Sequence, residues 1–324
     1  SRSDVTLIRE FKFRHSNRTW TGVPIVAANM DTTGVFGVAK VLQNHSMLTC
    51  LQKFYSTKQC SEAWNDNVDP NFVAITCGST ENSLDLLKKK MSTSKGISMI
   101  CVDVANGYRE IFLDYIKEVR INFPDSIVIA GNVATREMTE ALILAGADVV
   151  KVGIGPGSVC TTRKVAGVGY PQLSAISECA DAAHGLGGHV MADGGCSSPG
   201  DVAKAFSAGA DFVMLGGMLA GHDESGGELV EGENGKMYKS FYGMSSAKAM
   251  QEYYGEIAKH RAPEGKEVRV PYRGGLEETV QAILGGVRSA CSYVGARRIK
   301  DLPKCTTFIR VTRTTNEVYQ RFNV

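Results

Sequence analysis

Short apolar runs rich in β-branched residues alternate with helical patterns along almost the whole chain. The runs are continuously apolar, which indicates that both faces of each strand are buried, as in a parallel sheet covered by helices. The predicted strands are VPIVAAN from Val23, MLTCL from Met47, FVAITCG from Phe72, ISMICVDVA from Ile97, SIVIAGNV from Ser126, ADVVKVGIG from Ala147, HVMADGG from His189 and ADFVMLGG from Ala210.

Helical patterns fill the intervals between these strands, over 33–44, 82–90, 108–123, 135–145, 174–184 and 198–208. Thr135 and Ser198 are placed to cap two of the helices, and Pro199 suits a first turn. Eight such units predict an α/β fold, a single (β/α)₈ TIM barrel over 1–324. A doubly wound open sheet is the alternative, but it usually has fewer units, and the glycine fingerprint after the first strand is missing.

The alternation stops over 219–275, where Gly, Glu, Lys and Tyr dominate and only 245–259 has a helical pattern. In a barrel this insertion follows the eighth strand, on the face where active sites form. We therefore expect 219–275 to act as a flap. After it, 276–294 predicts a long amphipathic helix, and TTFIRVT from Thr306 a short strand or an extended arm. A strand pair is expected at the start of the chain.

Composition and charge favour a soluble protein with a small-molecule site. The 36 basic and 34 acidic residues nearly cancel, so no nucleic-acid or anionic-membrane partner is expected. No run of 18 apolar residues and no signal region occur, which predicts a cytoplasmic protein without a membrane span. Nine cysteines without CxxC pairs fit a reducing compartment, and the spacing of the histidines predicts no transition-metal site.

The first motif with chemical potential is GIGPGSVCTTR, from Gly153 to Arg163, after the sixth predicted strand. Cys160 ends this glycine loop close to Arg163, surroundings that would lower the pKa of the thiol and favour a nucleophilic thiolate. An incidental cysteine in a tight turn is the alternative. The other cysteines are expected to pack or to lie on the surface, and among them only Cys196 could approach the site.

Two glycine pairs follow the seventh and eighth strands, Gly194-Gly195 and Gly216-Gly217, where barrels commonly bind phosphate through backbone N–H groups. Asp193 precedes the first pair, and its negative charge would face away from a phosphate, toward sugar hydroxyls. The segments from Asp103 to Gly107 and from Asn29 to Asp31 should add polar side chains at the same end of the barrel. Helix capping would also explain Asp31.

Four blocks spread along the chain carry a resemblance that spans nearly its whole length. They are GIGPGSVCTTR from Gly153, DGGCSSPGDVAKA from Asp193, ADFVMLGGMLAG from Ala210 and FYGMSS from Phe241. These blocks resemble the IMP dehydrogenase and GMP reductase family, whose members form (β/α)₈ barrels, commonly tetramers. The resemblance implies that Cys160 attacks C2 of a purine nucleotide, that Thr162 and Glu264 form a proton-transfer pair, and that the protein is a homotetramer.

The resemblance also implies residues for each ligand. The nucleotide, GMP or IMP, would contact Ser158, Asp193, Gly194, Gly195, Gly216, Gly217, Gly243, Met244, Ser245, Arg261, Glu264 and Gly265. NADPH would contact Ser1, Arg2, Lys53, Asp103, Val104, Ala105, Ile154, Gly155, Met244, His260, Arg261, Ser289, Ala290, Cys291 and Ser292. A monovalent cation, K⁺, would be held by carbonyl groups of Gly155, Gly157 and Cys160 with Arg163 nearby. Ser1 and Arg2 would reach a neighbouring subunit, and Arg2 would select the 2′-phosphate of NADPH.

Two features favour the reductase branch of the family: Arg163 after CTT, and the segment RAPEGK from 261 to 266. That branch would reduce GMP with NADPH to IMP and ammonia through a covalent Cys160 thioimidate. The alternatives are oxidation of IMP to XMP with NAD, and a barrel that binds purine nucleotides without catalysis. Gln52 and Phe54 flank Lys53 where the family's reductases carry histidine.

Overall fold

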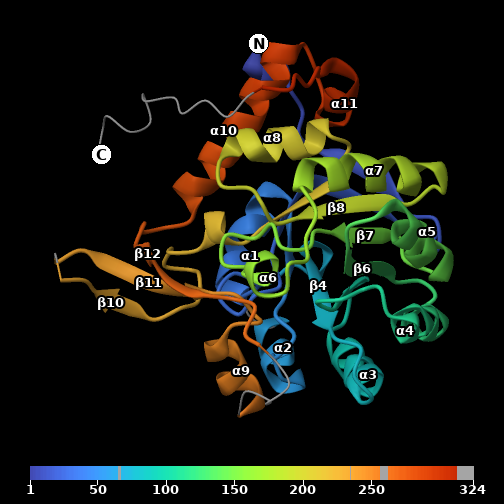
Figure 1. Ribbon diagram of the computed structural model, residues 1–324, viewed down its shortest axis with the longest axis vertical. Helices are drawn as coiled ribbons and strands as arrows, with labels where there is room; N and C mark the ends of the chain where they lie inside the picture. Colours follow the sequence, from blue (N-terminus) through green and yellow to red (C-terminus); the bar gives the residue numbers. More distant parts are fainter. Residues whose placement is uncertain (65–66, 234, 256–261, 312–324) are drawn as a thin grey trace.

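The computed structural model describes residues 1–64, 67–233, 235–255 and 262–311. Its centre is a closed barrel of eight parallel strands, in which each strand pairs with the next and the last pairs with the first (Figure 1). The barrel strands are β2 (Thr19–Ala27), β3 (Met47–Cys50), β4 (Val73–Cys77), β5 (Met99–Asp103), β6 (Ile127–Val133), β7 (Val149–Val152), β8 (His189–Asp193) and β9 (Phe212–Leu215). All eight predicted strands and the predicted TIM barrel are therefore confirmed.

Helices surround the barrel. They are α1 (Phe36–Leu42), α2 (Thr57–Trp64), α3 (Ser83–Thr93), α4 (Glu110–Asn122), α5 (Arg136–Ala145), α6 (Thr162–Val165), α7 (Gln172–Gly185), α8 (Pro199–Ser207), α9 (Ala247–Tyr254), α10 (Glu277–Val294) and α11 (Leu302–Cys305). Short 3₁₀ turns are η1 (Arg2–Asp4), η2 (Gln43–His45), η3 (Pro70–Phe72), η4 (Gly217–Leu219) and η5 (Ile299–Asp301). The predicted helices are confirmed, while the mostly polar α2 was not predicted. None of the described helices is long and apolar enough to cross a bilayer.

The two predicted helix caps have different outcomes. Ser198 accepts a hydrogen bond from the Asp201 backbone and forms a capping box with that residue, with Pro199 in the first turn. Thr135 occupies the predicted N-cap position of α5, but its side chain makes no capping hydrogen bond. The Thr135 hydroxyl instead accepts a hydrogen bond from the Tyr108 hydroxyl, 3.3 Å away.

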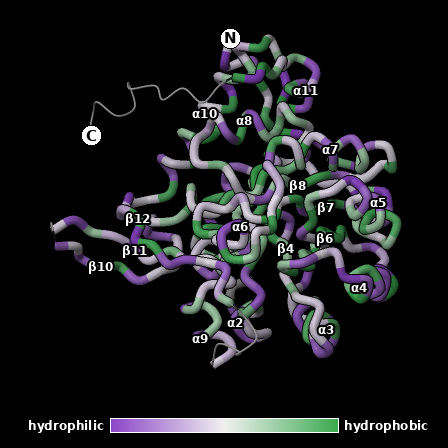
Figure 2. The backbone as a smooth tube through the Cα atoms, in the orientation of Figure 1, coloured by the Kyte–Doolittle hydropathy of each residue, from purple (hydrophilic) through white to green (hydrophobic). Residues whose placement is uncertain are grey.

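The hydrophobic core lies inside the barrel and between its strands and helices. Figure 2 shows hydrophobic residues along β6, β7 and β8. Strand β1 (Arg9–Lys12) pairs antiparallel with β2, which confirms the strand pair predicted at the start of the chain. Phe11 of β1 is buried, with its ring stacked on Phe212 at 4.4 Å between centroids. It closes the end of the barrel at which the parallel strands begin, which we call the lower end.

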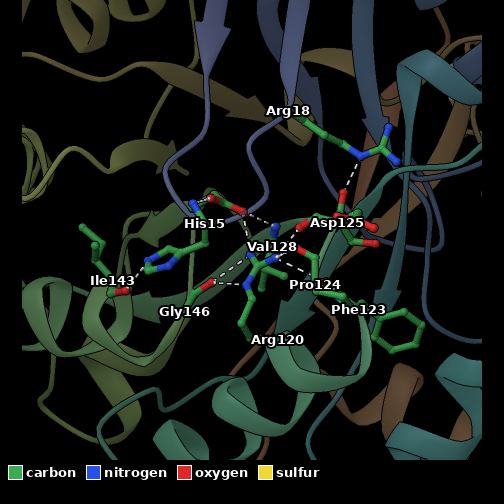
Figure 3. Close-up of polar contacts among 11 residues, drawn as sticks. His15, Arg18, Arg120, Phe123, Pro124, Asp125, Val128, Ile143 and Gly146 are labelled. Carbon is green, nitrogen blue, oxygen red and sulfur yellow. Dashed lines mark hydrogen bonds and ion pairs between the residues drawn. The ribbon is translucent and has the colours of Figure 1, made fainter.

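Two buried carboxylates hold the ends of strands together at this lower end, and we call their surroundings the base clusters. Asp148, just before β7, lies 2.7 Å from the Arg120 guanidinium and accepts backbone N–H bonds from His15 and Val128 (Figure 3). Asp211, just before β9, contacts Arg9, His184 and the Val190 backbone.

Electrostatics favour the charged form of the second of these carboxylates. Burial alone would raise the pKa of Asp211, but the hydrogen bond from His184, together with His189 at 3.5 Å, holds that pKa well below its usual range. The base clusters therefore tie β1, α4, α7 and the strand starts together through ionised groups.

The insertion between β9 and α10 contains more regular structure than predicted. Besides α9, it forms an antiparallel sheet of β10 (Leu229–Glu231), β11 (Met237–Tyr242) and β12 (Glu267–Pro271). The prediction of a single helix was therefore wrong: β10 and β12 are short and at most half-buried, so they lack a strong apolar pattern. Residues 256–259 of the predicted helix lie outside the described part of the chain. In the C-terminal tail, 306–311 are in neither helix nor strand.

Candidate active site

The glycine loop that carries Cys160 connects β7 to α6 at the upper end of the barrel, which we call the mouth. Gly153 begins it, and a side chain there would lie 2.1 Å from the carbonyl oxygen of Asp193. Gly194 adopts a positive φ of 88° and lies close to the Gly157 backbone. Glycine at these positions lets the loops after β7 and β8 pack directly against each other.

The insertion contacts this loop through its backbone. Thr161 donates a backbone hydrogen bond to the Glu264 carbonyl (2.8 Å), and Lys266 donates one to the Val159 carbonyl (2.9 Å). Glu264 in turn donates its backbone N–H to the Ser245 carbonyl, 3.0 Å away. These bonds place a segment about a hundred residues further along the chain directly beside Cys160.

A short hydrogen-bonded chain of side chains results. The Cys160 thiol donates to the Thr162 hydroxyl at 3.3 Å, and that hydroxyl donates to the Glu264 carboxylate at 2.7 Å. Cys160 is partly exposed, so a reactant can reach its sulfur. Thiol, hydroxyl and carboxylate in this order can pass a proton from the nucleophile to a base.

Arg163 lies on the same loop, with its guanidinium donating to the Tyr170 carbonyl at 2.5 Å. Its hydrocarbon stem packs against Gly155 and Gly169, where a side chain on either glycine would collide with it. The Gly157 carbonyl accepts the backbone N–H of Cys160 at 3.1 Å. The loop therefore carries several carbonyl oxygens, with a cationic side chain fixed to its rim.

A second polar group, the mouth cluster, consists of Asp103, Asn132, Lys151 and Asp193. The Lys151 ammonium lies 2.7 Å from Asp103 and 2.6 Å from Asp193, and the Asn132 amide donates to Asp193 at 2.8 Å. Burial alone would lower the pKa of Lys151, but the two carboxylates raise it above the usual lysine value. Burial alone would raise the pKa of Asp103, but Lys151 lowers it, with further help from Lys53 and Asn29.

Sequence reasoning assigned no role to Lys151 or Asn132. A signal was present, because a lysine within the apolar run VVKV must be buried and therefore paired. Asn132, at the end of β6, carries no such signal. The expected gathering of Asn29 with Asp103 at the mouth is found.

Asp31 does not act as a helix cap. Its carboxylate accepts hydrogen bonds from the hydroxyls of Tyr242 (2.5 Å) and Tyr253 (2.8 Å), and burial raises the pKa of Asp31. Phe54 stacks on Tyr253 with 3.6 Å between ring centroids. These contacts attach the insertion to the loops after β2 and β3, beside the predicted cofactor residue Lys53.

The predicted phosphate loops border a cavity of about 410 Å³. Ser158 and Gly217 line it together, and a side chain on Gly217 would lie 3.1 Å from the Ser158 hydroxyl. Lys266 and Arg273 line the same cavity and give it positive charge. Cys196 lies at its wall, and burial raises the pKa of its thiol to about 12, as expected for a cysteine that packs.

Most predicted substrate residues meet at the mouth. Gly243 approaches the Val159 carbonyl and Gly265, and its carbonyl accepts the backbone N–H of Ser246, a turn that contains Met244 and Ser245.

The predicted cofactor residues fall into two groups. Asp103 ends β5, and Val104, Ala105, Ile154 and Gly155 lie in the loops that follow β5 and β7 at the mouth. Ser1 and Arg2 belong to η1 and its cap, which contacts α10, the helix that carries 289–292 (Figure 1). Cys291 is buried there, and burial raises the pKa of its thiol to about 11. The predicted residues His260 and Arg261 lie outside the described part of the chain.

Comparison with known proteins adds an independent line of information. The family model described as "IMP dehydrogenase / GMP reductase domain" matches residues 10–318. A protein named "GMP reductase" from Caenorhabditis elegans is 58% identical over 327 residues, covering 100% of this chain and 91% of the relative. "GMP reductase 2" from Homo sapiens is 58% identical over 320 residues (98% and 92%), and "GMP reductase" from Vibrio cholerae is 56% identical over 323 residues (99% and 93%).

Proposed function

The chain belongs to the IMP dehydrogenase / GMP reductase family, and we propose that it reduces GMP to IMP and ammonia with NADPH. One observation carries this proposal: the Cys160–Thr162–Glu264 chain, with its contacts of 3.3 and 2.7 Å. Reductive deamination needs a nucleophile and also a group that protonates a departing amine. The three hydrogen-bonded side chains offer both. The relatives named GMP reductase, at 56–58% identity, favour the same activity.

The first half-reaction follows from the direction of the hydrogen bonds. Cys160 transfers its proton through Thr162 to Glu264, and the resulting thiolate adds to C2 of GMP. Glu264 then returns that proton through Thr162 to the 2-amino group. The C2–N bond breaks, ammonia leaves, and a Cys160 thioimidate remains, with every atom accounted for.

The second half-reaction breaks the carbon–sulfur bond. NADPH, when bound, supplies the hydride that C2 accepts. Cys160 leaves as a thiolate, and a proton taken up from solvent restores the thiol, which lies 3.3 Å from the Thr162 hydroxyl. The Cys160 loop and Glu264 are held together by backbone bonds, so the relay stays assembled through both halves.

The remaining substrate contacts fit a mononucleotide. We assign the phosphate to the cavity beside Ser158 and Gly217, where Lys266 and Arg273 add positive charge. Asp193 accepts hydrogen bonds in the mouth cluster, and its partly exposed carboxylate suits ribose hydroxyls. Phosphate and ribose would then be held on opposite sides of Gly194-Gly195.

The cofactor and cation assignments rest on the mouth loops and on α10. Lys53, Asp103 to Ala105, Ile154 and Gly155 would hold the nicotinamide end of NADPH. Ser1, Arg2 and 289–292 form a second group, because η1 contacts α10, the helix that carries 289–292. A neighbouring copy in a homotetramer would bring this second group to the site. The carbonyls of Gly155, Gly157 and Cys160 offer the oxygen ligands that K⁺ prefers.

The insertion, 219–275, would serve as the flap of a single-domain barrel in the cytoplasm. Backbone bonds from Glu264 and Lys266 to the Cys160 loop support this role, since they bring the flap to the nucleophile. Its opening would let the nucleotide enter.

The decisive assay mixes the protein with GMP and NADPH in K⁺ buffer and follows NADPH absorbance, with IMP and NAD⁺ in parallel. GMP-dependent loss of NADPH is expected. The Cys160→Ala variant should lose at least about four orders of magnitude in turnover yet still bind GMP by calorimetry. Cys305→Ala, at an exposed position, is the matched control and should keep full activity. NADH formation from IMP instead would make the protein a dehydrogenase, and GMP binding without turnover would make it a binding barrel.

A further inference from the structure

We propose that Lys151 is a positioning residue that orients the cofactor-side and substrate-side carboxylates at once. The inference rests on the proposed function, which gives Asp103 to the cofactor and Asp193 to the ribose. It assigns a role to a side chain that the proposed chemistry does not use. Lys151 would set the affinity for both ligands without touching either of them.

Alternation along the strands places the three charged side chains in one layer. Val149, Cys101 and Met191 belong to the apolar cluster inside the barrel. Asp103, Lys151 and Asp193 each follow one of these residues by two positions, so their side chains also point inward. They form the last layer before the mouth, with hydrocarbon beneath it and the loops that hold Cys160 above it.

The distances make Lys151 the link between the two carboxylates. Its ammonium contacts Asp103 of β5 at 2.7 Å and Asp193 of β8 at 2.6 Å, and its side chain is 3% exposed. The two carboxylates are 26% and 21% exposed, so each keeps an edge open toward the mouth. A buried ammonium above an apolar layer has few alternative positions. The fixed ammonium therefore restricts the orientation of both carboxylates that contact it.

Charge explains why the link must be a cation. Two carboxylates that contact one nitrogen would repel each other without it, and one of them would turn away or take up a proton. Either change removes an ionised acceptor from one ligand. The Asn132 amide donates to Asp193 and to the Gly153 carbonyl but not to Asp103, so it cannot replace the connection between the two carboxylates.

The test is a steady-state comparison of Lys151→Met with Arg120→Met. Both variants remove a buried cation from a buried carboxylate, but Arg120 lies in a base cluster. We expect the KM for GMP and the KM for NADPH each to rise at least about tenfold in Lys151→Met. Arg120→Met should lower only the stability, with both KM values unchanged in the folded enzyme.

Two further variants guard the interpretation. Lys151→Arg keeps the charge and should return both KM values at least part of the way. If Lys151→Met does not fold, Lys151→Gln, which keeps a hydrogen-bond donor without charge, takes its place with the same expectation. Unchanged KM values in a folded, uncharged variant, or a rise for one ligand only, would overturn the inference. Absence of turnover in the unmodified protein would instead refute the proposed function.

Discussion

The base clusters and the mouth cluster contain the same chemical pair, a carboxylate next to a cation, at opposite ends of the barrel. At the base, the side chains of Asp148 and Asp211 are 0% and 2% exposed, and backbone N–H groups share in satisfying them. At the mouth, Asp103 and Asp193 are 26% and 21% exposed and keep free edges. The two ends therefore carry the same charged groups but differ in the oxygen lone pairs that the protein leaves unused. At the base, protein donors occupy them, whereas at the mouth some stay open to a ligand.

The direction of the strands explains this division. In a parallel barrel the loops after the strands gather at one end, where backbone and side chains can be shaped around a ligand. The short turns before the strands leave no such room, so carboxylates there are enclosed. Removing a mouth group should therefore affect activity, and removing a base group should affect stability.

After the loss expected for Cys160→Ala, the largest effect should come from Glu264→Gln at the mouth. The amide cannot accept the proton that Thr162 delivers, so ammonia release should slow by about 10²- to 10⁴-fold. Quenched-flow measurement of ammonia, compared with NADPH oxidation, separates the deamination step from hydride transfer. Glu278→Gln, in the exposed first turn of α10, is the control and should behave as the unmodified protein. An unchanged deamination rate would remove Glu264 from the relay.

A smaller effect should come from Arg120→Met at the base, and it should change stability rather than catalysis. This change leaves the Asp148 carboxylate buried without its cation and should lower the unfolding free energy by about 3 kcal/mol or more. Urea unfolding measures it, while kcat and both KM values of the folded enzyme should stay unchanged. Loss of activity in fully folded Arg120→Met would contradict the separation of the two ends.

The smallest effect should be a pH-dependent change in stability at the base cluster around Asp211. The hydrogen bond to Asp211 raises the pKa of His184 above its ordinary value of about 6.5. Stability from this pair is therefore fully present below the unfolded pKa and is lost as pH rises through the higher folded pKa. The stability difference between the unmodified protein and His184→Gln should shrink from about pH 5.5 to about pH 9.

The expected size is below about 1 kcal/mol, since the His184 side chain is 45% exposed. Urea titrations at both pH values test the expectation. A difference that stays constant or grows with pH would contradict the assigned direction of the pKa shift. Activity per folded molecule should not change in this variant.

The sequence by itself determined the barrel. The continuously apolar runs from Val23 to Ala210 indicate strands buried on both faces, and the helical patterns between them supply the crossovers that parallel strands need. Cys160 was equally visible, because a glycine loop after a barrel strand is a local feature. The strands of the insertion were not visible, since β10 and β12 bury little apolar surface and depend on pairing with β11.

Only the tertiary structure decided which distant groups meet. Glu264 reaches Thr162 because backbone hydrogen bonds join the insertion to the Cys160 loop. Phe54 and Asp31 contact Tyr253 because α9 lies against neighbouring barrel loops. Lys151 joins Asp103 to Asp193 because closure of the barrel points all three into one layer. Local patterns follow from the periodicity of burial in the chain, whereas these pairings depend on distances across the barrel, which no stretch of sequence encodes by itself.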